Sequence, residues 1–393
     1  MMVSWKKVFA MSMLGLTLCS VAQVNLRPEI AKNLQNAQVE MIDKNFDAAL
    51  KYATSARSFV DLNTQERIMI EKAILVAAIN AKDFSTATEA AKYLSHQDTL
   101  SNAEQMAYLE ILINILGSKS QAYELSIYAK EYLSKGGEKE SVRRLYVQSL
   151  SMQKMHTEVI NFLSEVEHSK NFKPLAEQEL QALAIAHKMT KNDEMYMNTL
   201  KRLVVTSTNK DYFLGYIEQV KKNKEYKKRY ELDLLRLMLA KNLIEDPIDY
   251  IYYAQTALQF GFPFEAKSVV QMGNKVNAFN SDLASAKVKE LTNEIEKKIK
   301  IDEKQILVLE RSNNESDFAE LAEMYFSKGN YKQAIEKYKQ ALAAKSVRRE
   351  TELRLHYLIA LAKEADFDLA NQVLLSLGSD KTASEIGFLW LRK

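Results

Sequence analysis

Residues 327–345 read SKGNYKQAIEKYKQALAAK, and this stretch decides the fold. After the glycine, small and aromatic residues recur three and four positions apart, which is the spacing of one face of a helix. The same spacing occurs before the glycine, from Phe318 to Tyr325. The pattern predicts two helices joined by a short turn, in which alanines allow a close approach and aromatic rings fill the space around it. The core positions are Phe318, Leu321, Ala322, Tyr325, Gly329, Tyr331, Ala334, Tyr338 and Ala341.

In order and spacing, these positions resemble the tetratricopeptide repeat, a helical hairpin of about 34 residues. One departure is Ser346, which stands where the repeat usually has a terminal proline. The resemblance implies a right-handed superhelical solenoid. Ligand contacts in such a solenoid usually come from the first helix of each hairpin, on the concave side.

Weaker copies of the hairpin occupy most of the remaining chain. A single hairpin cannot bury its own apolar face, so stability must come from stacking on its neighbours. The residues that begin the second helix of the hairpin, at 330–335, have similar counterparts at 45–50, 83–87 and 364–370. Further pairs of helices are expected at 102–134, 138–168, 174–206, 211–242 and 247–273.

The composition of the 393 residues also favours an all-α fold, because Pro and Gly number only 4 and 10. Each proline stands where a helix is expected to begin, and six glycines follow apolar runs as helix C-terminal caps do. The prolines are Pro28, Pro174, Pro247 and Pro263, and the glycines are Gly117, Gly136, Gly137, Gly261, Gly329 and Gly378.

Residues 1–22 have the features of a secretory signal peptide: two lysines, an apolar stretch and small residues before Gln23. Cleavage would remove Cys19, the only cysteine, so we expect neither disulfides nor thiolate chemistry in the mature chain. It would leave 52 basic side chains, two fewer than the full 54, against 51 acidic ones. This balance gives no reason to expect nucleic acid as a partner. The alternative is an uncleaved segment that anchors the protein to the membrane.

We divide the rest of the chain into degenerate hairpins over 23–281, a long charged helix over 282–311, and C-terminal repeats with a capping helix over 312–393. The long helix is expected to brace the C-terminal repeats. Its expected apolar positions are Leu283, Val288, Leu291, Ile295 and Ile306.

Two further stretches, 211–273 and the C-terminal end from 355, are similar to a family of signal-peptide-bearing bacterial tetratricopeptide proteins. The likeness covers most of the mature chain in the right order. It implies an exported all-helical protein of a Gram-negative type of cell, located in the periplasm. It implies no reaction and no assigned ligand residues.

No motif in the sequence predicts catalysis. None of the five histidines, His96, His156, His168, His187 and His356, has a second ligand at a metal-binding spacing, and each is interpreted as a surface or interhelical residue. Phosphate-binding glycine loops and nucleophile motifs do not occur in the sequence. We therefore expect neither enzymatic activity nor a cofactor.

Two groups of residues are candidate contacts for a partner protein. The first is the exposed face predicted for the first helix of the best repeat, with Ser316, Ala319, Glu323, Phe326 and Ser327. Ala319 and Glu323 replace the Lys and Asn that clamp a terminal carboxylate in chaperone-binding relatives, which argues against a chaperone-tail receptor. The second group is the basic run with Lys221, Lys222, Lys227, Lys228 and Arg229, which is either a solvated helix end or a patch for an acidic partner. The nearby Tyr252 and Tyr253 cannot both face the core of one helix.

The sequence thus predicts a non-enzymatic scaffold in the cell envelope that holds a protein segment in a concave groove, without a membrane span once the signal is removed. One alternative is an envelope enzyme that hydrolyses cell-wall glycan, which would need a positioned acid in a separate catalytic fold. Another is an interaction subunit tethered by its uncleaved signal segment.

Overall fold

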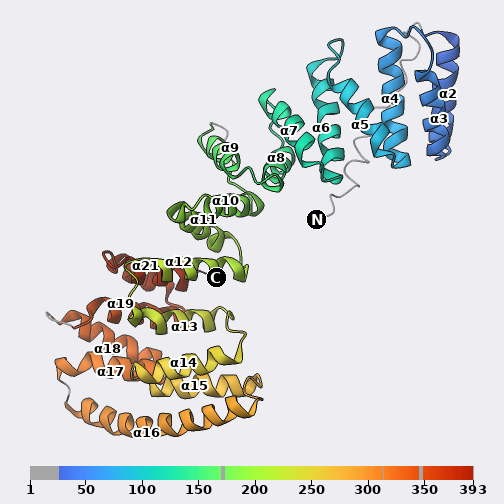
Figure 1. The fold of residues 1–393 in the computed structure, drawn as a ribbon. Helices are drawn as coiled ribbons and strands as arrows, with labels where there is room; N and C mark the ends of the chain where they lie inside the picture. The colour runs from blue at the N-terminus through green and yellow to red at the C-terminus, as the bar shows by residue number, and fades with distance from the viewer. Residues whose placement is uncertain (1–25, 170–172, 313, 345–347, 393) are drawn as a thin grey trace. The chain divides into compact units, whose positions relative to one another are not determined.

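Helices joined by short turns make up the computed structural model, which describes residues 26–169, 173–312, 314–344 and 348–392 (Figure 1). Over these ranges the structure contains no β-strand, and most helices pack against the next helix of the same compact unit. The predicted all-α class and the stacking of consecutive helical hairpins are confirmed. The predicted signal peptide lies outside the described residues. The chain consists of two compact units, and the boundary between them lies between Asn192 and Asp193.

The N-terminal unit consists of hairpins in which each helix packs on the next along the chain. Its helices are α2 Pro28–Ile42, α3 Phe46–Arg57, α4 Thr64–Ala81, α5 Phe84–Ser95, α6 Asn102–Ser118, α7 Ala122–Ser134, α8 Glu140–Met152, α9 His156–His168 and α10 Glu177–Met189. The contact between α3 and α4 and that between α4 and α5 are rich in buried alanines, which allow the helix backbones to approach closely.

Buried glutamates join successive hairpins of this unit. Glu66 in the first turn of α4 accepts a hydrogen bond from the backbone N–H of its N-cap residue Asn63 and pairs with Arg27 of the preceding hairpin at 3.0 Å. Glu179 in the first turn of α10 pairs in the same way with Arg143 of α8 at 2.6 Å. An acidic group here complements the helix N-terminus, and its arginine partner sets the register between neighbouring hairpins.

The C-terminal unit holds the remaining helices: α11 Asp193–Thr206, α12 Lys210–Lys222, α13 Glu231–Ala240, α14 Pro247–Gln259, α15 Pro263–Lys275, α16 Asp282–Ser312, α17 Phe318–Ser327, α18 Tyr331–Ala343, α19 Glu350–Lys363, α20 Phe367–Ser376 and α21 Lys381–Trp390. Short 3-10 turns, η2 Lys228–Tyr230 and η3 Glu315–Asp317, precede α13 and α17.

This unit folds back on itself. The chain runs through α13, α14 and α15, turns through α16, and returns through α17, α18 and α19 alongside the first three (Figure 1). The last helix, α21, then packs against α12 and α13. The inner faces of the outgoing and returning helices therefore cover each other, and we call the contact between them the seam.

The long helix α16 agrees with the predicted charged helix to within one residue at its C-terminal end. It packs on α14, α15 and α17, as expected of a brace. Val288, Leu291, Ile295 and Ile306 are buried as predicted, whereas Leu283 is 82% exposed. The prediction for Leu283 was wrong because it lies in the first turn, on the side opposite the buried face.

Most of the predicted helix boundaries are confirmed, with two exceptions. Pro28, Pro247 and Pro263 begin α2, α14 and α15, but α10 begins three residues after Pro174. Gly117 lies inside α6 and caps nothing. At Gly329 the backbone has φ = +75°, a left-handed conformation that glycine adopts more readily than a residue with a Cβ, as suits the turn between α17 and α18.

Candidate functional site

The residues of the best predicted repeat pack as expected. Leu321, Ala322 and Tyr325 on α17 are buried, and so are Ala334, Tyr338 and Ala341 on α18. Phe318 and Tyr331, at the N-terminal ends of the two helices, are half-buried. The spacing rule therefore identified the inner face of this hairpin correctly.

The predicted partner-binding face of α17 needs correction. Phe326 is 5% exposed, Ser327 is buried, and the side chain of Glu323 is 15% exposed. Of the five predicted positions, Ser316 is exposed and Ala319 is half-buried. The physical reason is the fold of the unit, since α13 and α15 of the same chain contribute side chains to the face that a partner was expected to occupy.

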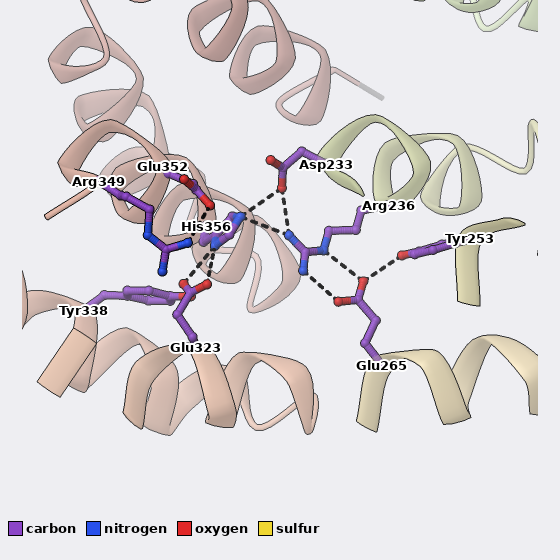
Figure 2. A network of polar contacts seen from close by, with 9 residues as sticks. All are labelled: Asp233, Arg236, Tyr253, Glu265, Glu323, Tyr338, Arg349, Glu352 and His356. Atoms are coloured by element: carbon purple, nitrogen blue, oxygen red, sulfur yellow. Dashed lines mark hydrogen bonds and ion pairs between the residues drawn. The ribbon is translucent and has the colours of Figure 1, made fainter. Parts of the chain in front are cut away.

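A single arginine occupies the centre of this face. Arg236 on α13 makes a bidentate pair with Glu265 on α15, at 2.9 Å from Nε to Oε1 and 2.7 Å from Nη2 to Oε2 (Figure 2). Its Nη1 also donates to Oδ1 of Asp233 at 2.8 Å, one turn earlier on α13. The hydroxyl of Tyr253 on α14 donates to Glu265 at 2.8 Å. Burial alone would lower the pKa of Arg236, but the two carboxylates outweigh it and raise that pKa.

On the returning side of the seam, His356 of α19 links two carboxylates. Its Nε2 lies 3.1 Å from Oδ1 of Asp233 and its Nδ1 lies 2.8 Å from Oε1 of Glu323 on α17 (Figure 2). Burial would lower the pKa of the imidazole, but Glu323 and Asp233 together raise it to about 10. His356 is therefore an imidazolium at neutral pH. Tyr338 on α18 donates its hydroxyl hydrogen to Glu323 at 2.6 Å.

Aromatic rings enclose both cations. The guanidinium carbon of Arg236 lies 4.4 Å from the ring centroid of Phe262 and 4.7 Å from that of Phe326. The ring of His356 stacks on Phe326 with centroids 5.4 Å apart and an angle of 16° between planes. Such contacts favour a desolvated cation because the ring faces carry negative potential. The result is a buried network of two cations and three carboxylates, provided by four helices, that holds the seam together.

The basic run between α12 and α13 is engaged mostly within the chain. Lys221 pairs with Glu231 at 2.8 Å and Lys222 with Glu218 at 2.6 Å. Across the turn, Lys227 and Arg229 both reach Asp380, at the N-terminal end of α21. Tyr230 also donates to Asp380, at 2.7 Å. This part of the run ties the return of α21 to the start of α13, which agrees with the interpretation as a helix end. Lys228 lies exposed in the 3-10 turn.

A cleft of about 140 Å³ opens beside the network, where α15, α17, α19 and α21 meet. Its lining mixes polar and apolar side chains and includes five aromatic rings, those of Tyr253, Phe264, Phe326, Tyr331 and Trp390. Of the adjacent tyrosines on α14, Tyr253 is 2% exposed and Tyr252 is 44% exposed, which confirms that only one of them faces inward.

Two lysines line the same cleft as cations. The ammonium of Lys328, in the turn after α17, lies 5.2 Å from the ring centroid of Phe264. That of Lys363, at the end of α19, lies 5.3 Å from the ring of Trp390. Neither ammonium makes an ion pair within the part of the chain that the structure describes. Although solvent reaches Lys363, partial desolvation lowers its pKa.

Sequence reasoning missed the network because its members are far apart in the chain. His356 was interpreted as an isolated histidine, yet its partners lie 33 and 123 positions earlier. One signal was present in the sequence: Asp233 and Arg236 stand three residues apart in an otherwise apolar stretch, LDLLRLML. Charged residues so placed are almost never buried unless they are paired.

Comparison of the chain with protein-family models and with curated proteins finds no match. None of the helices in the described ranges combines the length and apolar character that crossing a membrane would need. Over the same ranges, no three histidine, cysteine or acidic side chains are arranged to hold a metal ion.

Proposed function

We propose that this protein is a non-enzymatic scaffold of tetratricopeptide-like hairpins that binds a segment of a partner protein in the bacterial cell envelope. The observation that carries the proposal is a cleft at the seam of the C-terminal unit that combines aromatic rings with two lysines, neither of which makes an ion pair within the described residues. Stacked hairpins are a common support for extended binding surfaces. The signal-peptide pattern of residues 1–22 supports export to the periplasm.

The charged network beside the cleft supports a structural function for its acids. Glu265 is held by Arg236 and Tyr253, and Glu323 by His356 and Tyr338. Buried carboxylates with lowered pKa, such as Asp233 and Glu323, are poor general acids near neutral pH. The network instead holds the cleft walls in one arrangement, which reduces the entropy lost when a segment binds.

The proposal is tested by photocrosslinking in the native cell. A photoreactive amino acid replaces Met272, which lines the cleft on α15 and is 41% exposed. The matched control carries the same group at Val308, an exposed position on α16 that does not line the cleft. We expect a discrete protein adduct from position 272 and none from position 308. No adduct from position 272, or the same adducts from both positions, would refute the proposal.

Export is tested separately by fractionating the cells and sequencing the N-terminus of the protein. A mature chain that starts near Gln23 in the periplasmic fraction is expected. An intact Met1 in the membrane fraction would instead support the tethered alternative.

A further inference from the structure

We propose that the cleft binds one acidic side chain, an aspartate or glutamate, projecting from an extended segment of the partner protein. This inference rests on the proposed function and names the chemistry that the cleft recognises. It is carried by three hydrogen-bond donor groups around the cleft that have no acceptor among the described residues: the ammonium groups of Lys328 and Lys363 and the indole N–H of Trp390.

The lysines are the first reason to expect an anion. Other lysines of the C-terminal unit, such as Lys201 and Lys221, have carboxylate partners at 3.0 Å and 2.8 Å. Lys328 and Lys363 have ring contacts instead. A ring face attracts an ammonium group but accepts no strong hydrogen bond, so its donors remain available for a carboxylate. Hydrogen bonds between ammonium and carboxylate are among the stronger ones in proteins.

Trp390 provides a second and independent reason. Its side chain lines the cleft and the residue is only 6% exposed, yet its Nε1–H has no hydrogen-bond partner within the described residues. An indole N–H is a donor only, and a buried one usually finds an acceptor. A carboxylate provides two acceptor oxygens, enough to engage this donor together with a lysine.

The acid already present in the cleft would not repel such a ligand strongly. Glu265 is compensated by the bidentate guanidinium of Arg236 and accepts from Tyr253. The two lysines then leave an excess of positive charge at this position. Since partial desolvation lowers the pKa of Lys363, a bound carboxylate would also offset the cost of that desolvation.

The size of the cleft favours one side chain of a larger partner over a free cofactor. Sites for drug-sized ligands occupy about 300–1,000 Å³, whereas this cleft has a volume of about 140 Å³. The half-buried rings of Phe264 and Tyr331 line it as well and provide apolar surface for the residues flanking the acid. The arrangement therefore suits an acidic residue within an extended peptide that also carries apolar side chains.

The test is selection from a phage library of random linear dodecapeptides against the full-length protein. Peptides fused to a coat protein by their C-terminal end have no free terminal carboxylate, so any acid recognised must be a side chain. We expect selected peptides to be enriched in Asp or Glu. A selected peptide, synthesised with an amidated C-terminus, should bind Lys328→Gln/Lys363→Gln at least about tenfold more weakly than the original protein, because a charge-assisted hydrogen bond contributes roughly one tenfold step or more in affinity.

The matched control is Lys332→Gln/Lys339→Gln, which removes two exposed lysines of α18 that do not line the cleft. It should bind the peptide as the original protein does. Binding is followed by the fluorescence of Trp390 in a Trp5→Phe background, which also shows that each variant is folded. Replacing the acid of the peptide by its amide should abolish the change in fluorescence.

Three results would overturn the acidic-segment assignment: peptides without enriched acids, equal affinity of the cleft variant and the original protein, or no selected peptides. None of these results would affect the photocrosslinking experiment at position 272, because that experiment detects a bound partner protein whether or not an acidic side chain enters the cleft. Failure of this inference is thus distinguishable from failure of the proposed function.

Discussion

Removing the side chain of Arg236 should destabilise the C-terminal unit severely. Arg236→Met leaves Glu265 without its bidentate partner, and Asp233, whose side chain is 1% exposed, retains only His356. Removing one partner of a buried pair costs about 3–5 kcal/mol, because the remaining charge is desolvated without compensation. The loss of contact with two aromatic rings adds to this cost. The total is a large fraction of the roughly 5–15 kcal/mol by which a domain is stable.

The assay is equilibrium unfolding in urea, followed by tryptophan fluorescence of a Trp5→Phe protein. Trp390 is then the only tryptophan, and it lies in α21 within the same unit as the network. With a slope of about 2–3 kcal/mol per molar urea, the midpoint for Arg236→Met should fall by about 1–2.5 M.

Two further proteins make this prediction decisive. Arg236→Met/Glu265→Met removes both partners and should regain part of the lost stability, since Glu265 then no longer leaves a largely buried carboxylate without its guanidinium. Lys210→Ala disrupts an exposed pair with Glu245 and should cost no more than about 1 kcal/mol. The reasoning is refuted if Arg236→Met costs as little as Lys210→Ala, or if the double variant is less stable than the single one.

Three other changes are predicted in the same assay. Because the pKa of His356 is raised from 6.5 to about 10 on folding, its contribution is complete below pH 6.5 and declines as pH rises toward 10. The unfolding free energy should therefore fall between pH 6.5 and 9 by up to about 1.4 kcal/mol per pH unit. A His356→Gln protein whose stability keeps the same dependence on pH would show that His356 is not the group responsible. Ala334→Leu should overpack the fully buried contact between α17 and α18 and cost about 1–3 kcal/mol, so an unchanged urea midpoint would count against close packing there. Gly273→Ala would place a Cβ 2.3 Å from the ring of Phe279 and should cost about 1–2 kcal/mol despite the better helix propensity of alanine, whereas a more stable protein would show that the ring moves aside.

Local patterns sufficed to predict the helices. A helix face repeats within every three or four residues, so the positions of Ala334 and Tyr338 follow from their spacing alone. The expected pairs at 102–134, 138–168 and 247–273 coincide with α6 and α7, α8 and α9, and α14 and α15. The predictions for Leu283 and Pro174 were wrong because both residues lie near the start of a helix, where the repeating pattern of apolar residues continues in one direction only.

The candidate site could be predicted only in part. Periodicity places Glu323 and Phe326 together on one face of α17, but it does not say what covers that face. A one-dimensional stack would leave it open to a partner, as the sequence suggested. In the structure the side chain of Arg236 from α13 occupies it.

The order of residues along the chain is enough to predict the class of fold, the hairpins and the face along which the two helices of the best hairpin pack, because these depend on residues a few positions apart. The return of α17 to α19 alongside α13 to α15, and the packing of α21 on α13, are visible in the tertiary structure alone, and they determine which acids and cations meet. That return depends on contacts between residues more than a hundred positions apart, such as the ion pair of Asp233 with His356, whose combined desolvation and pairing energies no local pattern records.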